Sequence, residues 1–174
     1  MKYKELLNLF WKMCSEILKD EIENPDKFIR KKYPVNGSPD WKIDDDILFL
    51  NLSEKDDEYA KQFQSVYKTS YGDVIRERSR TRVWELFITA YGDNSYDLLN
   101  KIKDGVFREN IKRILSKNAV FLIPNLPTIQ SMPEMFSGKW WNRFDLPLYF
   151  NECYIAESEN LGSVEHLTLE MSGL

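Results

Sequence analysis

The residues that most often perform acid–base or metal chemistry are scarce in this chain of 174 residues. It has one histidine, His166, and two cysteines, Cys14 and Cys153, so a zinc site would lack ligands. His166 falls in a candidate strand, where a surface or hydrogen-bonded histidine is the usual outcome rather than a general base. For Cys14 the helical pattern favours a buried, inert thiol, with a disulfide to Cys153 as the minor alternative.

Two acidic clusters offer oxygen ligands for a hard cation. Asp44, Asp45 and Asp46 are consecutive, as are Asp56 and Asp57. Consecutive aspartates in a strand or loop point in different directions, so solvated turns are expected rather than a metal site. The glycine-rich phosphate-binding motifs and the hydrolase nucleophile motif do not occur. We therefore expect no catalytic residue, no metal ligand and no cofactor, and a protein that is not an enzyme.

The clearest chemical signal is aromatic. The segment GKWWNRFDLPLYF places Trp140 and Trp141 close to Arg143, and protein interfaces favour these side-chain types. The sequence therefore predicts that this segment lies near a subunit boundary. The alternative is that the two tryptophans cover the edge of the core of their own domain.

The strand that follows alternates between apolar and other residues. Its apolar residues from Phe144 to Phe150 share one face, and the opposite face carries Arg143, Pro147 and Tyr149. Because proline cannot donate a ladder hydrogen bond, Pro147 predicts a sheet edge that a loop or a neighbouring subunit shields. The strand is expected to continue to Ile155 after a parity shift at residues 151–152.

Length and charge limit the class of protein. The chain is long enough for one domain over residues 1–174. A formal charge of −4 argues against a general nucleic-acid binder, which needs a basic patch. No apolar run is long enough to span a membrane, and charged residues interrupt the only candidate signal peptide, so the start is expected to be that of a mature cytosolic protein.

The elements that must position these residues follow from periodicity. Residues 3–19 form an amphipathic helix whose apolar arc spans roughly 200°, wider than the ~100° stripe that one packing surface needs. This width predicts either a deeply embedded helix or a flank, including Trp11, that meets another subunit. Residues 94–116 predict a helix with a capping box at Asn94 and Asp97, broken at residues 104–105. Candidate strands lie at residues 28–33, 47–52, 82–91, 120–123, 140–155 and 164–171.

Strands joined without crossovers favour an α+β fold, mainly an antiparallel sheet of about four to six strands with helices packed on one face. The strand at residues 82–91 is apolar on both faces, although helices are predicted for only one side. This excess of apolar sheet surface predicts self-association.

A polar stretch at residues 53–79 is too long for a hairpin turn and is expected to form an arm or loop. Its aromatic residues Tyr59, Phe63 and Tyr67 recur at three to four residues, so part of it could be helical. Long loops in compact domains are often the functional part. The candidate subunit or partner interface therefore comprises Trp11, Tyr59, Phe63, Tyr67, Trp140, Trp141, Arg143 and Tyr149.

Two segments resemble the phage neck and tail-terminator proteins, the head–tail joining group. They are WELFITAYGDNSYDLLNKI, from Trp84 to Ile102, and GKWWNRFDLPLYF. In that family a strand ends in a Tyr-Gly turn that opens a helix, and an aromatic residue and an arginine lead a later alternating strand. The resemblance covers about residues 1–158.

The resemblance implies a ring-forming structural protein, usually a hexamer, at the head-proximal end of the tail tube. Its partners would be its own copies, the tail tube protein and a head-completion or connector protein, with genomic DNA passing through the lumen without specific binding. It implies a place in the virion neck after assembly in the bacterial cytoplasm, with no membrane contact. Another neck, connector or minor tail protein stays open, as does a non-viral protein- or nucleic-acid-binding module.

Overall fold

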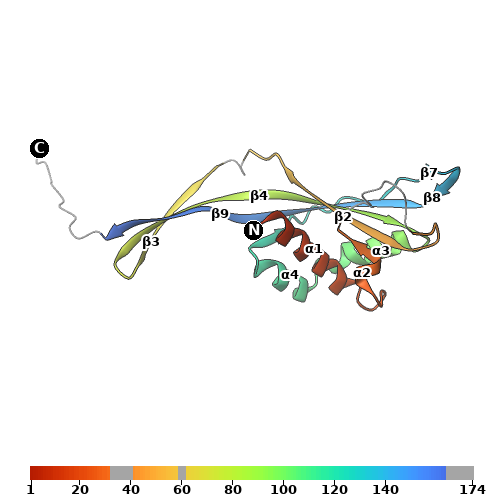
Figure 1. Cartoon of the computed structure of the whole chain (residues 1–174), viewed down its shortest axis with the longest axis horizontal. Helices are drawn as coiled ribbons and strands as arrows, with labels where there is room; N and C mark the ends of the chain where they lie inside the picture. The colour runs from red at the N-terminus through yellow and green to blue at the C-terminus, as the bar shows by residue number, and fades with distance from the viewer. Residues whose placement is uncertain (32–40, 59–61, 164–174) are drawn as a thin grey trace, which may run out of the picture.

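The computed structural model describes residues 1–31, 41–58 and 62–163, and shows one elongated sheet with helices against one half of it (Figure 1). Its helices are α1 (Tyr3–Ile17), α2 (Pro25–Phe28), α3 (Ser95–Gly105) and α4 (Glu109–Ser116). Its strands are β1 (Ile29–Arg30), β2 (Ile47–Lys55), β3 (Gln64–Ser70), β4 (Asp73–Tyr91), β5 (Val120–Leu122), β6 (Gln130–Ser131), β7 (Glu134–Phe136), β8 (Lys139–Trp141) and β9 (Arg143–Ser163).

The α+β class is confirmed, but the strands outnumber the four to six that were predicted. Seven strands form one sheet in the order β1-β2-β4-β9-β5, with β3 also paired to β4 and β6 to β9. The β7 and β8 strands form a separate hairpin. Only the short β1–β2 pair is parallel in the described sheet, so the antiparallel prediction holds for the long strands.

The main core lies between the sheet and α1, α3 and α4. The apolar arc of α1 is buried as its periodicity predicts, and Phe10 stacks on Phe150 of β9 at 4.6 Å between ring centroids. The predicted helix break is confirmed, since α3 ends at Gly105 and α4 begins at Glu109. A Cβ on Gly105 would lie 2.4 Å from Ile17, so this glycine permits the close approach of α3 to α1.

A second apolar cluster lies on the opposite face of the sheet, at the end where β8 begins. Its buried members are Ile47, Phe49, Tyr91 and Trp141, and Trp41 and Ile43 pack against them. The rings of Trp41 and Trp141 lie 6.1 Å apart in an edge-on arrangement. The chain itself therefore covers this end of the second face, which the sequence pattern did not predict.

The parity shift predicted at residues 151–152 is wrong. Phe150 and Glu152 are both buried, so the alternation continues through this point. The irregularity lies farther along, where Ser79 pairs with Ile155 but Arg78 pairs with Glu157. One residue of β9 is therefore bulged at Ala156. A charged residue at a core position caused the error, because Glu152 was assigned to the solvent face.

Asn94 is the N-cap of α3, as predicted, but the predicted capping box is wrong. The Asn94 side chain makes no cap hydrogen bond to the helix. Instead its amide Nδ2 donates to Asp46 Oδ2 at 2.8 Å, and its backbone N–H donates to Asp46 Oδ1 at 2.9 Å. One aspartate of the acidic triplet thus ties the loop before β2 to the turn before α3.

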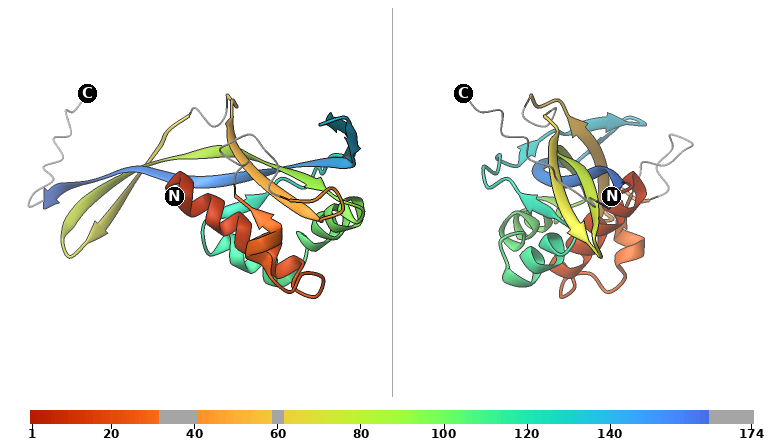
Figure 2. Two further views of the ribbon diagram at one scale, coloured as in Figure 1. Left: turned by 45° about the vertical axis from the view of Figure 1, so that its right-hand side comes forward. Right: turned by 90° about the vertical axis from the view of Figure 1, so that its left-hand side faces the viewer.

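Residues 53–79 contain the end of β2, all of β3 and the start of β4. The helical alternative is wrong for Phe63 and Tyr67, since Tyr67 lies in β3 and Phe63 lies in no helix. Tyr59 and the strand predicted at 164–171, with His166, lie outside the described residues. We call residues 64–82, which contain β3 and the start of β4, together with residues 153–163 of β9 the arm, and the rest the body. Figures 1 and 2 show the arm extending from the body with no described helix against it.

Within the described ranges, no helix is both long and apolar enough to cross a membrane.

Candidate interaction surfaces

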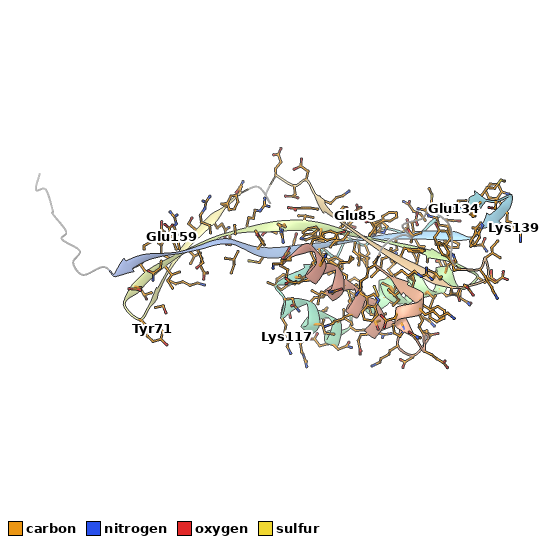
Figure 3. The ribbon with its side chains drawn as sticks, in the orientation of Figure 1. Tyr71, Glu85, Lys117, Glu134, Lys139 and Glu159 are labelled. Atoms are coloured by element: carbon orange, nitrogen blue, oxygen red, sulfur yellow. The ribbon has the colours of Figure 1, made fainter. Side chains whose placement is uncertain are left out.

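The arm is a three-stranded ribbon built on a tight turn. β3 pairs with β4 through seven residue pairs, from Gln64–Ser79 to Ser70–Asp73. The two turn residues, Tyr71 and Gly72, have φ values of 52° and 89°. Two consecutive positive φ values are those of a type I′ turn, whose twist matches that of a hairpin. Tyr71 is fully exposed at the far end of the arm (Figure 3).

Four arginines follow one face of the arm at every second residue of β4. They are Arg76, Arg78, Arg80 and Arg82, and period two places them on one side of the ribbon. The guanidinium groups of Arg78 and Arg80 lie 5.0 and 5.6 Å from the ring centroid of Phe63, within cation–π range. Phe63 therefore packs on this row rather than projecting freely, although 48% of its surface is exposed.

A buried carboxylate joins the arm to the body. Glu152 is 1% exposed, and its Oε2 accepts hydrogen bonds from Arg82 Nη2 at 2.8 Å and from Trp84 Nε1 at 2.7 Å. Its Oε1 accepts from the amino group of Met1 at 2.5 Å. Arg82 also stacks on Tyr154, 3.9 Å from its ring centroid. These contacts satisfy a charge that would otherwise be costly to bury.

The opposite end of the sheet carries an apolar surface on the β7–β8 hairpin and the residue before it. Trp140 is 65% exposed and Met135 is 59% exposed. Met132 and Phe136 are exposed as well. We call these four residues the hairpin surface; Met135 and Trp140 share one face of the hairpin, and Phe136 lies on the other face, where its ring is 6.2 Å from that of Trp141. Figure 3 places the β7–β8 hairpin, marked by Glu134 and Lys139, at the far end from Tyr71.

Arg143 fixes this hairpin to the sheet. Its Nε and Nη2 donate to the two oxygens of Asp145 at 3.1 and 3.0 Å, and its Nη1 donates to Glu134 Oε2 at 3.0 Å. Burial lowers the pKa of Arg143, but the hydrogen bonds with Asp145 and Glu134 outweigh burial and raise it above its ordinary value. The Tyr91 hydroxyl donates to the other oxygen of Glu134 at 2.6 Å.

The predicted interface residues do not gather at one place. Trp140 lies on the hairpin surface, whereas Trp141 is 8% exposed inside the second cluster. Trp11 is half-buried, and its indole donates to the Ile29 carbonyl at 2.9 Å. Tyr149 lies between the two ends, and its hydroxyl donates to Glu85 at 2.9 Å. That hydrogen bond, together with burial, raises the pKa of Tyr149.

Sequence reasoning missed several exposed residues of both ends. The sequence predicts an irregular segment or a bulged edge strand around Met132, Met135 and Phe136, and a turn at Tyr71, but it assigns none of these residues to an interface. The signal that could have revealed the arm was the arginine at every second position in RERSRTR. This alternation has the period of a strand, although it contains no apolar residue.

The described residues contain no group of three or more His, Cys, Asp or Glu side chains that could hold a metal ion. A pocket of about 440 Å³ lies where β2 ends and β3 begins, and polar side chains such as Gln64, Thr81 and Asn151 line much of it. Both cysteines are free, Cys14 buried and Cys153 exposed. Burial raises the pKa of the Cys14 thiol to about 12.

Comparison with known proteins identifies a family. The sequence model of the family described as "Phage neck terminator protein" matches residues 4–172, which include the arm, the body and the hairpin surface. A search of curated proteins finds no match.

Proposed function

The chain belongs to the phage neck terminator family, and from this premise we propose that it forms a closed ring that ends the tail tube beneath the head. As a member of this family it is a structural protein of the phage neck and associates with other head and tail proteins. The proposal adds the ring, the halt of tube polymerisation and the joining of the tail to the head connector. A hexamer is the symmetry that the resemblance implies.

One observation carries the proposal: two different exposed surfaces lie at opposite ends of one elongated sheet (Figure 3). Separate ends allow one end to contact neighbouring copies while the other docks another component, and heterologous contacts between copies close into a ring when the rotation permits. The arm ends in Tyr71, which is fully exposed, and the body ends in Trp140, which is 65% exposed. Exposed aromatic residues of this kind are typical of protein interfaces.

The proposed mechanism is steric and interfacial. A ring that binds the last layer of tube subunits occupies the surface on which the next layer would add, so growth stops. The hairpin surface supports a docking role, since methionine, phenylalanine and tryptophan supply apolar contact area without a fixed charge. The net charge of −4 supports passage of DNA through the lumen without specific binding, because like charges oppose phosphate contacts.

The test is tube capping. Tail tube protein is polymerised with and without this chain, and tube lengths and ends are measured by negative-stain electron microscopy. We expect short tubes with a ring at one end when the chain is present. Unrestricted tubes with bare ends, formed in the presence of folded chain, would refute the termination mechanism.

The role of the hairpin surface is tested with Trp140→Ser combined with Met135→Ser. Both side chains are exposed, so folding should be retained while tube capping is lost. Phe107→Ser is the matched control, since Phe107 is 43% exposed in the connection between α3 and α4. Equal capping by both variants would remove the hairpin surface from the proposal, without contradicting ring formation.

A further inference from the structure

The two outer strands of the arm present free backbone edges. Among the described strands, β3 pairs only with β4, so its other edge faces away from the sheet. On the opposite side, β9 pairs with β5 at residues 150–152, and the Cys153 N–H donates to the Ala119 carbonyl. In the described part of the chain, no strand pairs with the outer edge of β9 from Tyr154 to Ser163. Such edges are templates for another strand unless the sequence blocks them.

The same strand, β9, is protected in the body and unprotected in the arm. In the body, β6 pairs with residues 144–145 and β5 with residues 150–152, and Pro147 lies between these two segments. A proline at an edge removes the donor that a docking strand would use. Residues 154–163 contain no proline and no lysine, and β3 contains no proline. The sequence therefore blocks edge pairing at one end of β9 and leaves it open at the other.

Exposed apolar side chains of the arm lie on its two edge strands. Val66 and Tyr67 of β3 are 46% and 62% exposed, and Ile155 and Leu161 of β9 are 55% and 49% exposed. Val66 pairs with Glu77 and Ile155 with Ser79, both at odd positions of β4, so Val66 and Ile155 share one face. A neighbouring strand on either edge would cover these residues.

The charges of the two edges are opposite in sign. Lys68 is the one charged residue of β3 and forms an ion pair with Glu77, whereas Glu159 of β9 carries the opposite charge and forms an ion pair with Arg76. Pairing β3 with β3, or β9 with β9, would therefore bring like charges together. Pairing β3 with β9 avoids this, because Lys68 pairs with Ile75 and lies on the face of Ile155, whereas Glu159 pairs with Arg76 and lies on the opposite face. A ring also needs a contact between different edges of two copies.

We infer that the arms of neighbouring copies pair edge to edge, β3 of one copy with residues 154–163 of β9 of the next. β3 and β9 both run antiparallel to β4, so they point the same way, and a rotation about the arm's long axis places them side by side as parallel strands. This inference rests on the proposed ring, for which it names the contact. Repeated around a ring, the arms close into one barrel without free edges.

Disulfide capture in mixtures tests this contact. One chain carries a single cysteine on β3, as Gln64→Cys, Val66→Cys or Lys68→Cys, and the other carries Ile155→Cys. Both chains carry Cys153→Ser, and Cys14 does not form a cross-link because it is fully buried. Three positions are used because edge pairing allows more than one register, and all three share the face of Ile155. The mixture is assembled on tail tubes, oxidised and analysed on a non-reducing gel.

We expect a two-chain species from the mixture with at least one β3 position, and none from either chain alone. Tyr67→Cys is the matched control, because Tyr67 pairs with Arg76 and lies on the opposite face. A two-chain species from a β3 variant alone would show pairing of like edges and overturn the inference. Capped tubes without any cross-link would overturn the inference and leave the ring intact. Cross-links without capped tubes would support edge pairing and contradict the proposed function.

Discussion

The tripeptide Tyr-Gly-Asp occurs twice, once at the tip of the arm and once in the body, and its two environments differ sharply. At the arm tip, Tyr71 is fully exposed, and a Cβ on Gly72 would meet nothing within 4 Å. In the body, Tyr91 is 6% exposed, and a Cβ on Gly92 would lie 2.4 Å from the carboxylate of Asp46. Identical local sequence therefore serves a free turn in one region and a tightly packed junction in the other.

The difference shows what tertiary contacts add to local propensity. Both glycines have positive φ, 89° at Gly72 and 105° at Gly92, so both turns need a residue that tolerates this conformation. Only the body turn is held by packing on other elements. We therefore expect matched substitutions to be costly in the body and mild in the arm.

The largest difference in unfolding free energy is expected between removing a buried carboxylate and removing an exposed one. Glu152→Ala leaves Arg82 and Trp84 without their shared acceptor, and breaking a buried ion pair costs about 3–5 kcal/mol of unfolding free energy. Glu159→Ala removes an exposed pair with Arg76 and should cost less than about 1 kcal/mol. Urea denaturation followed by tryptophan fluorescence measures both. Equal costs would contradict the division into a packed body and an open arm.

The two glycines give the next largest difference. Gly92→Ala adds a methyl group that overlaps the backbone of Asp46 in a strained conformation, and should cost about 2–4 kcal/mol. Gly72→Ala meets no neighbour and should cost about 1 kcal/mol through its positive φ alone. Thermal unfolding of the two variants provides the comparison. A Gly72 variant as unstable as the Gly92 variant would show that the arm turn is packed in solution.

The smallest difference concerns the two thiols. The folded pKa of Cys14, about 12, lies above its ordinary value of 9.0, so only the unfolded chain ionises between these values. The stabilisation that the buried Cys14 thiol gives the folded state is therefore complete below pH 9. It is lost as the pH rises, so that the free energy of unfolding falls by about 1.4 kcal/mol at about pH 10. Cys14→Ala should lose this dependence, as denaturation at pH 8 and 10 would show.

A labelling experiment sharpens the same prediction. A maleimide at neutral pH should modify the exposed Cys153 and leave Cys14 unmodified until the chain unfolds. Mass spectrometry of peptides reports each site separately. Rapid modification of Cys14 in the folded chain would contradict the buried position of α1.

The periodicity of apolar residues predicted the helices of the body well, because burial of one face imposes that periodicity. The apolar arc of α1 and the rotated stripes of α3 and α4 follow from packing on one sheet face, and Gly105 marks the break between them. The prediction failed where polar side chains occupy buried positions. Glu152 lies in a core position because Arg82 and Trp84 satisfy it, and no local pattern encodes partners about 70 residues away.

The arm was recognised as a long polar segment but not as strands, because both of its faces are partly open to solvent. Strand prediction relies on one apolar face, and residues 73–81 alternate arginine with polar or apolar neighbours instead. Local sequence could not predict which residues bury Trp141 either. Its burial depends on Trp41, Phe49 and Tyr91, which come from separate elements.

The strands β4 and β9 run unbroken from the hairpin end to the arm, over 19 and 21 residues. Two antiparallel strands paired over such a length form one continuous element. At roughly 3.3 Å per residue the longer strand reaches about 70 Å. The pairing of β4 with β9 shifts register at two places, both in the arm: near Ala156 and between residues 160 and 163. If the hairpin surface docks another virion component, as proposed, a contact made at the arm would therefore also orient that surface.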